Sequence, residues 1–234
     1  GVYVTEILTG GTADKAGLKK GDVILAVDGK PIDQDGNYED ASFGRIAFSH
    51  ITNTISHPGD TLLFRIFREG NILEVPVKME PRDRSKIVSE SYVVDRAPRF
   101  VVLGGLVFME LSRPYLQEWG GDWPKEAPQR LVFYDAFQNE LPQDRGKIVF
   151  ISQILPSSDT IGYEDLDNLV VSKVNNREIR SLDDLAEAAR HPVDGFQKIE
   201  LEEDPGILFL DAAAIEENRD RLIKKYALPA LQRL

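Results

Sequence analysis

The chain has 234 residues, a formal net charge of −11 at neutral pH and no cysteine. This length and a hydrophobic content of 42% allow one large or two small domains with real cores. The acidic balance argues against nucleic acid as a partner, and the lack of cysteine excludes disulfides and thiolate chemistry. No apolar run approaches 18 residues and no leader-like stretch occurs, so we expect neither a membrane span nor a signal peptide in this segment.

The stretch from Gly17 to Ile32 indicates the fold of the first predicted region. The apolar run Val23 to Val27 is typical of a buried strand, and Asp28-Gly29 is a strong turn signal. Upstream, residues 2–8 form a second run with strand composition. Residues 12–16 predict a one-turn helix, with Thr12 as its cap.

The remainder of the first region predicts a loop, a helix and a hairpin. Residues 33–40 are polar and charged, which favours an exposed loop. Apolar positions from Phe43 to Ile55 follow helical spacing, with Phe48 off the stripe, either lining a groove or packing beneath the preceding loop. Residues 61–68 and 72–78 predict a β-hairpin in which Pro76 indicates an edge position or a site whose N–H would be unpaired.

An internal repeat predicts a second domain, because Val149 lies 147 positions after Val2 and the same offset keeps the other strand positions apolar. The further pairs are Val4 and Ile151, Ile7 and Ile154, Leu8 and Leu155, Val23 and Val170, Ile24 and Val171, Val27 and Val174, and Ile32 and Ile179. The turn has diverged: Gly17, Gly21 and Asp22 correspond to Glu164, Asn168 and Leu169.

The rest of the second region repeats the pattern of the first. Ser181 opens a helix as a capping-box variant, and His191-Pro192 stops it. A hairpin over 199–210 follows, and Asp211 is placed to cap a helix that runs to about Tyr226. An insertion over 112–146 holds both tryptophans of the chain, which either form an interface or close a small core.

The order strand, short helix, Gly-Leu-x-x-Gly-Asp turn, strand and Asp-Gly-x-x-Ile resembles the PDZ domains of Deg/HtrA-type (DegP-like) serine proteases. Within this family, the chain resembles the plant organellar and nuclear Deg branch and its bacterial relatives. The likeness lies in the insertion, in Leu106-Val107-Phe108 through Arg113-Pro114-Tyr115-Leu116, and in Asp35-Gly36 with Phe48-Ser49-His50. The resemblance covers essentially the whole chain.

This resemblance implies a mainly β fold with α (α+β), in which two PDZ-like, partly open β-barrels or sandwiches are each capped by helices. We place the first PDZ domain at 1–82, a linker at 83–98 and the second PDZ domain at 99–234, with the insertion at 112–146 and a C-terminal helix at 211–226. The first copy lacks its carboxylate loop and groove strand within these residues.

The run from Phe100 to Leu111 resembles the carboxylate-binding loop and groove strand of a PDZ domain, although a large apolar residue usually stands where Gly104 does. A peptide C-terminus needs converging N–H donors, which glycines allow, followed by an edge strand to which the peptide adds. A Gly-Gly pair in an apolar run also fits a simple bulge. The implied peptide-binding residues are Leu103, Gly104, Gly105, Leu106, Val107 and Phe108, with Leu182, Leu185, Ala186 and Ala189 from the helix.

No catalytic residue is expected in this segment, because the family's Gly-x-Ser-Gly-Gly string is absent and His50, His57 and His191 fit helix or capping positions. No metal or cofactor motif appears either. We expect Gly105→Val to weaken binding without unfolding the domain.

The sequence predicts a non-catalytic tandem-PDZ regulatory segment of a serine endopeptidase, with the protease domain outside this segment. It would bind peptide segments or C-termini of substrate proteins, or neighbouring subunits of a homo-oligomer. A scaffold or adaptor without an active protease is the alternative, as is an assembly-only module whose second groove is filled by its own insertion or tail. The compartment stays open: bacterial periplasm or cytoplasm is favoured, and plant organelle or nucleus is the alternative.

Overall fold

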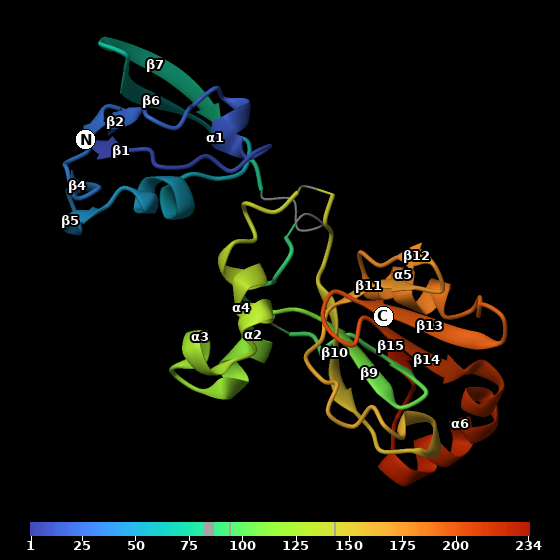
Figure 1. Ribbon diagram of the computed structural model, residues 1–234. Coiled ribbons are helices and arrows are strands. Elements are labelled where there is room, and N and C mark those ends of the chain that lie inside the picture. Colours follow the sequence, from blue (N-terminus) through green and yellow to red (C-terminus); the bar gives the residue numbers. More distant parts are fainter. Residues whose placement is uncertain (82–86, 94, 143) are drawn as a thin grey trace. The chain divides into compact units, whose positions relative to one another are not determined.

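A computed structural model describes residues 1–81, 87–93, 95–142 and 144–234, and the chain divides into two compact units, Gly1–Asp83 and Arg84–Leu234 (Figure 1). Each unit combines open, mainly antiparallel sheets with a few helices, so the predicted α+β fold class is confirmed. Residues 83–86 and 94 of the predicted linker at 83–98 lie outside the described residues, and the domain limits inferred from the sequence stay a prediction.

The first unit is built on one sheet of strand order β1-β2-β6-β7, with β3 beside β2. Its core lies between this sheet and a separate β4–β5 hairpin followed by a short π-helical turn. The elements are β1 (Val2–Tyr3), α1 (Thr12–Lys15), β2 (Val23–Val27), β3 (Lys30–Pro31), β4 (Asn37–Asp40), β5 (Gly44–Ala47), η1 (Ile51–Ile55), β6 (Thr61–Arg68) and β7 (Asn71–Lys78).

The strand over Val23–Val27, the Asp-Gly turn and the hairpin over 61–78 are confirmed, whereas only Val2–Tyr3 of the strand expected over residues 2–8 is present. Asp28 and Gly29 both have positive φ, 46° and 74°, which is the backbone that an Asp-Gly hairpin turn requires. Pro76 lies on the outermost strand, as expected. Thr12 is not the helix cap: Gly11 occupies the cap position, and Asp14 accepts from the backbone N–H of Gly10 at 2.7 Å.

Of the helix predicted over 43–55 only the turn at Ile51–Ile55 is present, and residues 44–47 form a strand instead. The exposed loop predicted over 33–40 is wrong from Asn37 on, where β4 begins. Tyr38 of β4 faces Ile46 of β5 across a hairpin, and both side chains reach the core from strands. Arg45 pairs with Asp33 and Asp35 across this hairpin, at 2.7 and 2.5 Å, and thereby orders the charged segment. The apolar spacing matched a helix because strand, bend and helical turn each contribute residues to one core.

Phe48 packs beneath the preceding loop, one of its two expected positions. Its side chain is half-buried against the core of the first unit, near Gly36. The backbone N–H of Phe48 donates to the carbonyl of Gly36 at 2.9 Å. The residue therefore ties the hairpin to the loop that begins it.

The second unit contains two four-stranded sheets, of order β10-β9-β8-β15 and β12-β11-β13-β14, around one large core. Its strands are β8 (Phe100–Leu103), β9 (Leu106–Glu110), β10 (Val149–Ile154), β11 (Val171–Val174), β12 (Arg177–Glu178), β13 (Phe196–Leu201), β14 (Ile207–Asp211) and β15 (Gln232–Arg233). Its helices are α2 (Arg113–Leu116), η3 (Gln117–Trp119), α3 (Trp123–Glu126), α4 (Gln129–Ala136), η4 (Ser158–Thr160), α5 (Leu182–Ala188) and α6 (Ala212–Tyr226).

Helices α2, η3, α3 and α4 build the insertion, and they surround a small core of their own. Leu116 and Leu131 are fully buried in it, and Trp119 and Trp123 are half-buried against it. Asp135 of α4 is buried, and it accepts from Ser89 and from the guanidinium of Arg113. Packing of the two tryptophans against this core favours the structural interpretation over an interface.

Asp211 caps α6 as predicted, since its carboxylate accepts from the backbone N–H groups of Ala213 and Ala214 at 2.8 and 3.0 Å. The helix ends at Ala227, whose left-handed φ of 49° turns the chain back. The last strand, β15, then pairs antiparallel with β8. The sequence offers a groove filled by the tail only as an alternative and does not predict which residues pair, because two paired residues leave no periodic pattern.

Candidate functional site

The residues implied for peptide binding occupy one hairpin and one helix. Leu103 ends β8, Gly104 and Gly105 form the turn, and Leu106, Val107 and Phe108 begin β9. Leu182, Leu185 and Ala186 belong to α5, and Ala189 is the residue that ends it.

The fold brings hairpin and helix together, but as parts of a closed core. Leu106, Phe108, Leu182 and Leu185 have no exposed surface, and Ala186 retains 7%. Half-buried Leu103 packs against the same cluster. Burial removes these side chains from direct contact with a ligand in this conformation, and their role in peptide binding stays a prediction.

Val107 and Ala189 lie outside that core. Val107 packs against a smaller cluster that includes Val102 and Leu222, on the opposite face of the hairpin. The half-buried Ala189 offers its carbonyl to the side-chain amide of Gln197 at 2.8 Å. The ten residues therefore do not line one common surface: most belong to the large core, Val107 lies on the other face of the hairpin, and Ala189 lies at the end of α5.

The Gly104-Gly105 turn is tightly enclosed. Both residues have positive φ, 60° and 102°. A Cβ on Gly104 would lie 2.9 Å from Ile215 of α6, and a Cβ on Gly105 would lie 2.8 Å from the carbonyl oxygen of Leu155. Contrary to the expectation from sequence, Gly105→Val should therefore destabilise the domain, because backbone strain and a backbone clash coincide there.

The strand expected at the sheet edge is not at the edge. β9 lies between β10 and β8, and the far side of β8 is taken by β15. Val101 faces Gln232 and Phe100 faces Arg233, and the N–H of Val102 donates to the carbonyl of Leu231 at 2.7 Å. The chain's own C-terminal segment thus occupies the position of an added strand.

Apolar packing holds this C-terminal segment in place. Leu228 and Leu231 lie with Tyr226 against the cluster of Val102, Leu155 and Leu222. The guanidinium of Arg233 lies 5.5 Å from the centre of the Phe100 ring, a distance suited to a cation–π contact. Only two residue pairs join the strands, so side-chain burial supplies much of the attachment.

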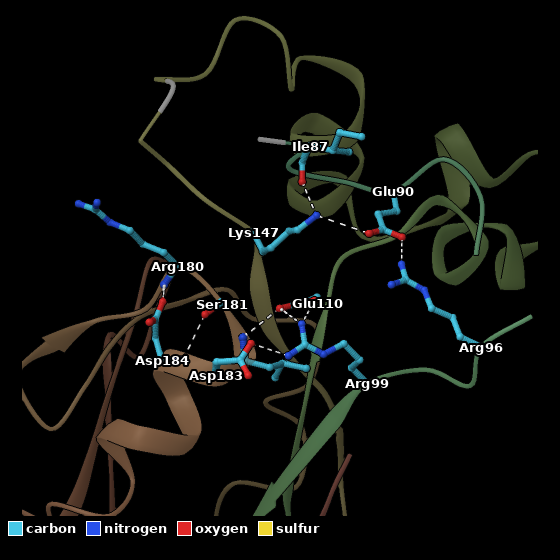
Figure 2. Close-up of polar contacts among 11 residues, drawn as sticks. Ile87, Glu90, Arg96, Arg99, Glu110, Lys147, Arg180, Ser181, Asp183 and Asp184 are labelled. Atoms are coloured by element: carbon cyan, nitrogen blue, oxygen red, sulfur yellow. Dashed lines mark hydrogen bonds and ion pairs between the residues drawn. The ribbon is translucent and has the colours of Figure 1, made fainter. Parts of the chain in front are cut away.

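Figure 2 shows how α5 is fixed to the hairpin. Glu110, at the end of β9, accepts from the N–H of Leu182 at 3.0 Å, in the first turn of α5. Arg99 donates to Glu110 at 3.3 Å and to Asp183 at 2.5 Å. Ser181 caps the helix as predicted by accepting from the N–H of Asp184 at 3.1 Å. These contacts hold α5 against the hairpin.

A second group of charges in Figure 2 anchors the segment before β8. Lys147 donates to the carbonyl of Ile87 at 2.6 Å and pairs with Glu90 at 3.6 Å, while Arg96 also pairs with Glu90. Beside this group lies a cavity of about 270 Å³ whose walls include Met109, Leu111, Pro114 and Tyr115.

Tyr115 is the most perturbed group of this cavity. Burial raises its pKa to about 12, and its hydroxyl donates to the side-chain oxygen of Asn168 at 2.8 Å. Sequence reasoning used Arg113-Pro114-Tyr115-Leu116 only to support the family resemblance. The cavity itself was missed because its walls come from segments far apart in the chain.

Each histidine has a local polar partner. His50 is 2.7 Å from the hydroxyl of Tyr38, His57 is 3.8 Å from Asp60, and His191 is 3.2 Å from Glu187. Among the residues that the structure describes, no cluster of three or more potential metal ligands occurs. Within the same residues, no helix has both the length and the apolarity to cross a membrane.

The fold and the repeated strand pattern agree with the comparison to known families. Residues 89–232 match the family model of a PDZ domain, and residues 3–43 match a second PDZ model. The first match covers more than half of the chain, so the chain belongs to the PDZ-domain family.

The predicted resemblance to Deg/HtrA-type proteases is also confirmed. The chain is 30% identical over 232 residues to the chloroplastic protease Do-like 2 of Arabidopsis thaliana, covering 98% of this chain and 36% of that protein. It is 26% identical over 214 residues to the putative mitochondrial protease Do-like 3 of the same plant, covering 91% and 35%. The serine protease DegP homolog of Plasmodium falciparum is 31% identical over 174 residues, covering 73% and 18%. The chain thus corresponds to the PDZ region of DegP-like proteases and spans about a third of the two plant proteins.

Proposed function

We propose that this chain is the non-catalytic regulatory segment of a Deg-type serine endopeptidase, and that it binds extended peptide segments at the edge of β8. The observation that supports this proposal is the pairing of β15 with β8, because an edge that accepts one short antiparallel strand has the geometry for another. The segment would deliver substrate to the protease domain and control its assembly.

Competition between the peptide and the chain's own C-terminal segment for the β8 edge determines the apparent affinity for the peptide. An incoming peptide must displace Gln232 and Arg233 from β8 and take over the apolar contacts of Leu231. The free edge is then a minor state, and the apparent dissociation constant rises by the inverse of its population. A peptide with an apolar residue at the position of Leu231 would compete best.

The occupied edge also favours a second candidate, an assembly-only module. In that case the C-terminal strand completes the domain permanently, and the other surfaces contact neighbouring subunits. A scaffold without an active protease would have the same PDZ units. The two candidates differ from the first in a measurable property, which is whether release of the C-terminal strand reveals peptide binding.

The test compares Leu231→Asp with Leu234→Asp. The first removes an apolar contact of the tail, whereas Leu234 is 47% exposed and serves as a matched control. We expect Leu231→Asp to tighten binding of a labelled peptide library roughly tenfold in fluorescence anisotropy, which corresponds to about 1.4 kcal/mol of tail attachment. The control should bind like the original chain.

Absence of binding by either variant, with circular dichroism showing both folded, would support the assembly-only module. A casein assay tests the division of labour separately. The chain by itself should not cleave casein, and cleavage would contradict its non-catalytic assignment.

A further inference from the structure

The outermost strand of the first unit, β7, presents an unpaired edge eight residues long (Figure 1). It pairs with β6 from Asn71 to Lys78, and no strand in the described part of the chain lies on its other side. Such an edge carries N–H and C=O groups ready to pair with a further strand.

The register shows which residues carry the outward groups. Leu63 of β6 bonds to Asp28 through both its N–H and its carbonyl, so its backbone groups point away from Pro76, its partner on β7. Opposite residues of an antiparallel pair alternate between bonded and non-bonded types. The carbonyl of Pro76 therefore points outward, away from β6. The backbone groups of Ile72, Glu74 and Lys78 point the same way, because these residues lie two or four positions from Pro76 along the strand.

The side chains beside this edge form an exposed apolar face. Leu63, Phe67 and Ile72 keep 41%, 42% and 54% of their surface exposed, and Pro76 is exposed as well. Phe67 faces Ile72 and Leu63 faces Pro76 across the two strands. The edge and the apolar face thus belong to one surface, which we define as the β7 surface: Leu63, Phe67, Ile72, Glu74, Pro76 and Lys78.

The equivalent edge of the second unit is blocked at Phe209. There the outermost strand is β14, and the hydroxyl of Tyr163 donates to the carbonyl of Phe209 at 3.0 Å and accepts from its N–H at 3.4 Å. The 147-residue offset places Ala16 where the second unit has Tyr163. Alanine has no group that can close the β7 edge in the same way.

We propose that the β7 surface joins two copies of this chain by antiparallel pairing of β7 with β7, with Val75 facing Val75 of the second copy. In this register Ile72 faces Lys78 of the second copy and Glu74 faces Pro76 of the second copy. About six main-chain hydrogen bonds form, because the outward groups meet and only the N–H of the two prolines is missing.

The charges of Glu74 and Lys78 favour this register and favour a second copy of the chain as the partner. Pairing centred on Glu74 sets two carboxylates directly opposite each other, and pairing centred on Pro76 forfeits both central hydrogen bonds. Centring on Val75 sets Glu74 diagonal to Lys78 of the second copy on both sides of the two-fold axis; these two attractive diagonals outnumber the single diagonal between the two Glu74 side chains. A strand carrying Glu74 and Lys78 four residues apart is therefore complementary to itself.

This inference goes beyond the proposed function and does not depend on peptide binding, since all of its residues lie in the first unit. It assigns a specific surface to self-association. Peptide binding at β8 and pairing at β7 are separately measurable, so either result leaves the other intact.

The experiment is sedimentation velocity on the full 234-residue chain across a concentration series, using charge exchange at β7. We expect the original chain to self-associate to dimers. Glu74→Lys and Lys78→Glu should each weaken association roughly tenfold, because each places like charges on the diagonals. The double variant Glu74→Lys with Lys78→Glu should restore it.

Glu39→Lys is the matched control, since Glu39 is an exposed carboxylate on β4 and its reversal changes net charge by the same amount. It should associate like the original chain. Hydrogen exchange supplies a second measurement: the Ile72 amide should exchange at least tenfold more slowly at dimer-forming concentrations than in dilute solution.

A chain that stays monomeric to millimolar concentration overturns the proposal. So does association that is unaffected by either single charge reversal, or that the double variant fails to restore. A slow Ile72 amide in dilute, monomeric solution would show that the edge is already covered within one chain, which also overturns it.

Discussion

The two units share their strand pattern but hold the same turn by different forces. In the first unit Asp22 is only 1% exposed, and its carboxylate accepts from Arg68 at 2.6 and 2.7 Å and from the N–H of Lys19 at 2.8 Å. In the second unit Leu169 stands at the equivalent position and packs partly buried against the core. One turn is thus held by an ion pair and the other by an apolar contact.

The strands therefore determine the fold, and the turn only needs a stabilising contact for its backbone and its buried side chain. The ion pair of the first unit fixes the loop because Arg68 also donates to the carbonyl of Gly17 at 2.8 Å. In the second unit Asn168 adopts the left-handed φ of 62°, and its N–H donates to the carbonyl of Ile151. A glycine-free, acidic turn thus closes on the same scaffold.

The largest expected effect comes from breaking the ionic turn. Arg68→Ala should lower the unfolding free energy of the first unit by about 4 kcal/mol, because it leaves the buried Asp22 carboxylate without its charged partner. Calorimetry, with hydrogen exchange to assign each transition to a unit, measures the loss.

Two variants sharpen this result. Arg65→Ala, on the exposed side of the same strand, should change stability by less than about 0.5 kcal/mol. The double variant Asp22→Leu with Arg68→Met imitates the apolar turn of the second unit and should recover most of the loss. Failure of that recovery would show that the ion pair is needed for the fold of the turn.

The hairpin turns provide the next comparison. Gly105→Ala should destabilise the second unit by about 3 kcal/mol, since left-handed strain adds to a clash with the Leu155 carbonyl. Gly70→Ala in the first unit should cost about 1 kcal/mol, because the φ of 84° is similarly left-handed but no atom lies within 4 Å of the added Cβ. Equal losses in urea unfolding would contradict the packing difference.

Removal of one oxygen atom should expose the β14 edge at Phe209. Tyr163→Phe removes the hydroxyl that bonds both backbone groups of Phe209, and we expect a loss of about 1 kcal/mol and faster exchange of the Phe209 amide. Tyr92→Phe is the control, because Tyr92 is 78% exposed. An unchanged Phe209 amide would show that the hydroxyl does not protect this edge.

The prediction with the smallest effect at neutral pH concerns how the stability of the first unit changes as Asp22 is protonated in acid. Hydrogen bonds from Arg68, with that from the Lys19 N–H, hold the pKa of Asp22 below its ordinary value of 3.8 despite burial. A lowered folded-state pKa gives stability that is complete above the ordinary value and is lost as pH falls through the folded-state pKa.

Acid unfolding of the first unit should therefore show a contribution below about pH 4 that the double variant Asp22→Leu with Arg68→Met lacks. The relevant measurement is the difference between the two proteins across pH 2 to 7, since other carboxylates titrate in both. Parallel curves would exclude a contribution from Asp22.

Sequence pattern alone was enough to predict the central strands of both units, the hairpins over 61–78 and 199–210, the cap at Asp211 and the family, because these depend on local alternation, turn chemistry and a repeat visible along the chain. The hairpin over 37–47 could not be read locally, because one core collects side chains from unlike elements; the sequence indicated a loop up to residue 40 and a helix from residue 43. Tertiary packing also decided the candidate site. Strand partners depend on segments far apart in sequence, so only the folded chain sets β9 between two strands and β15 on the edge of β8.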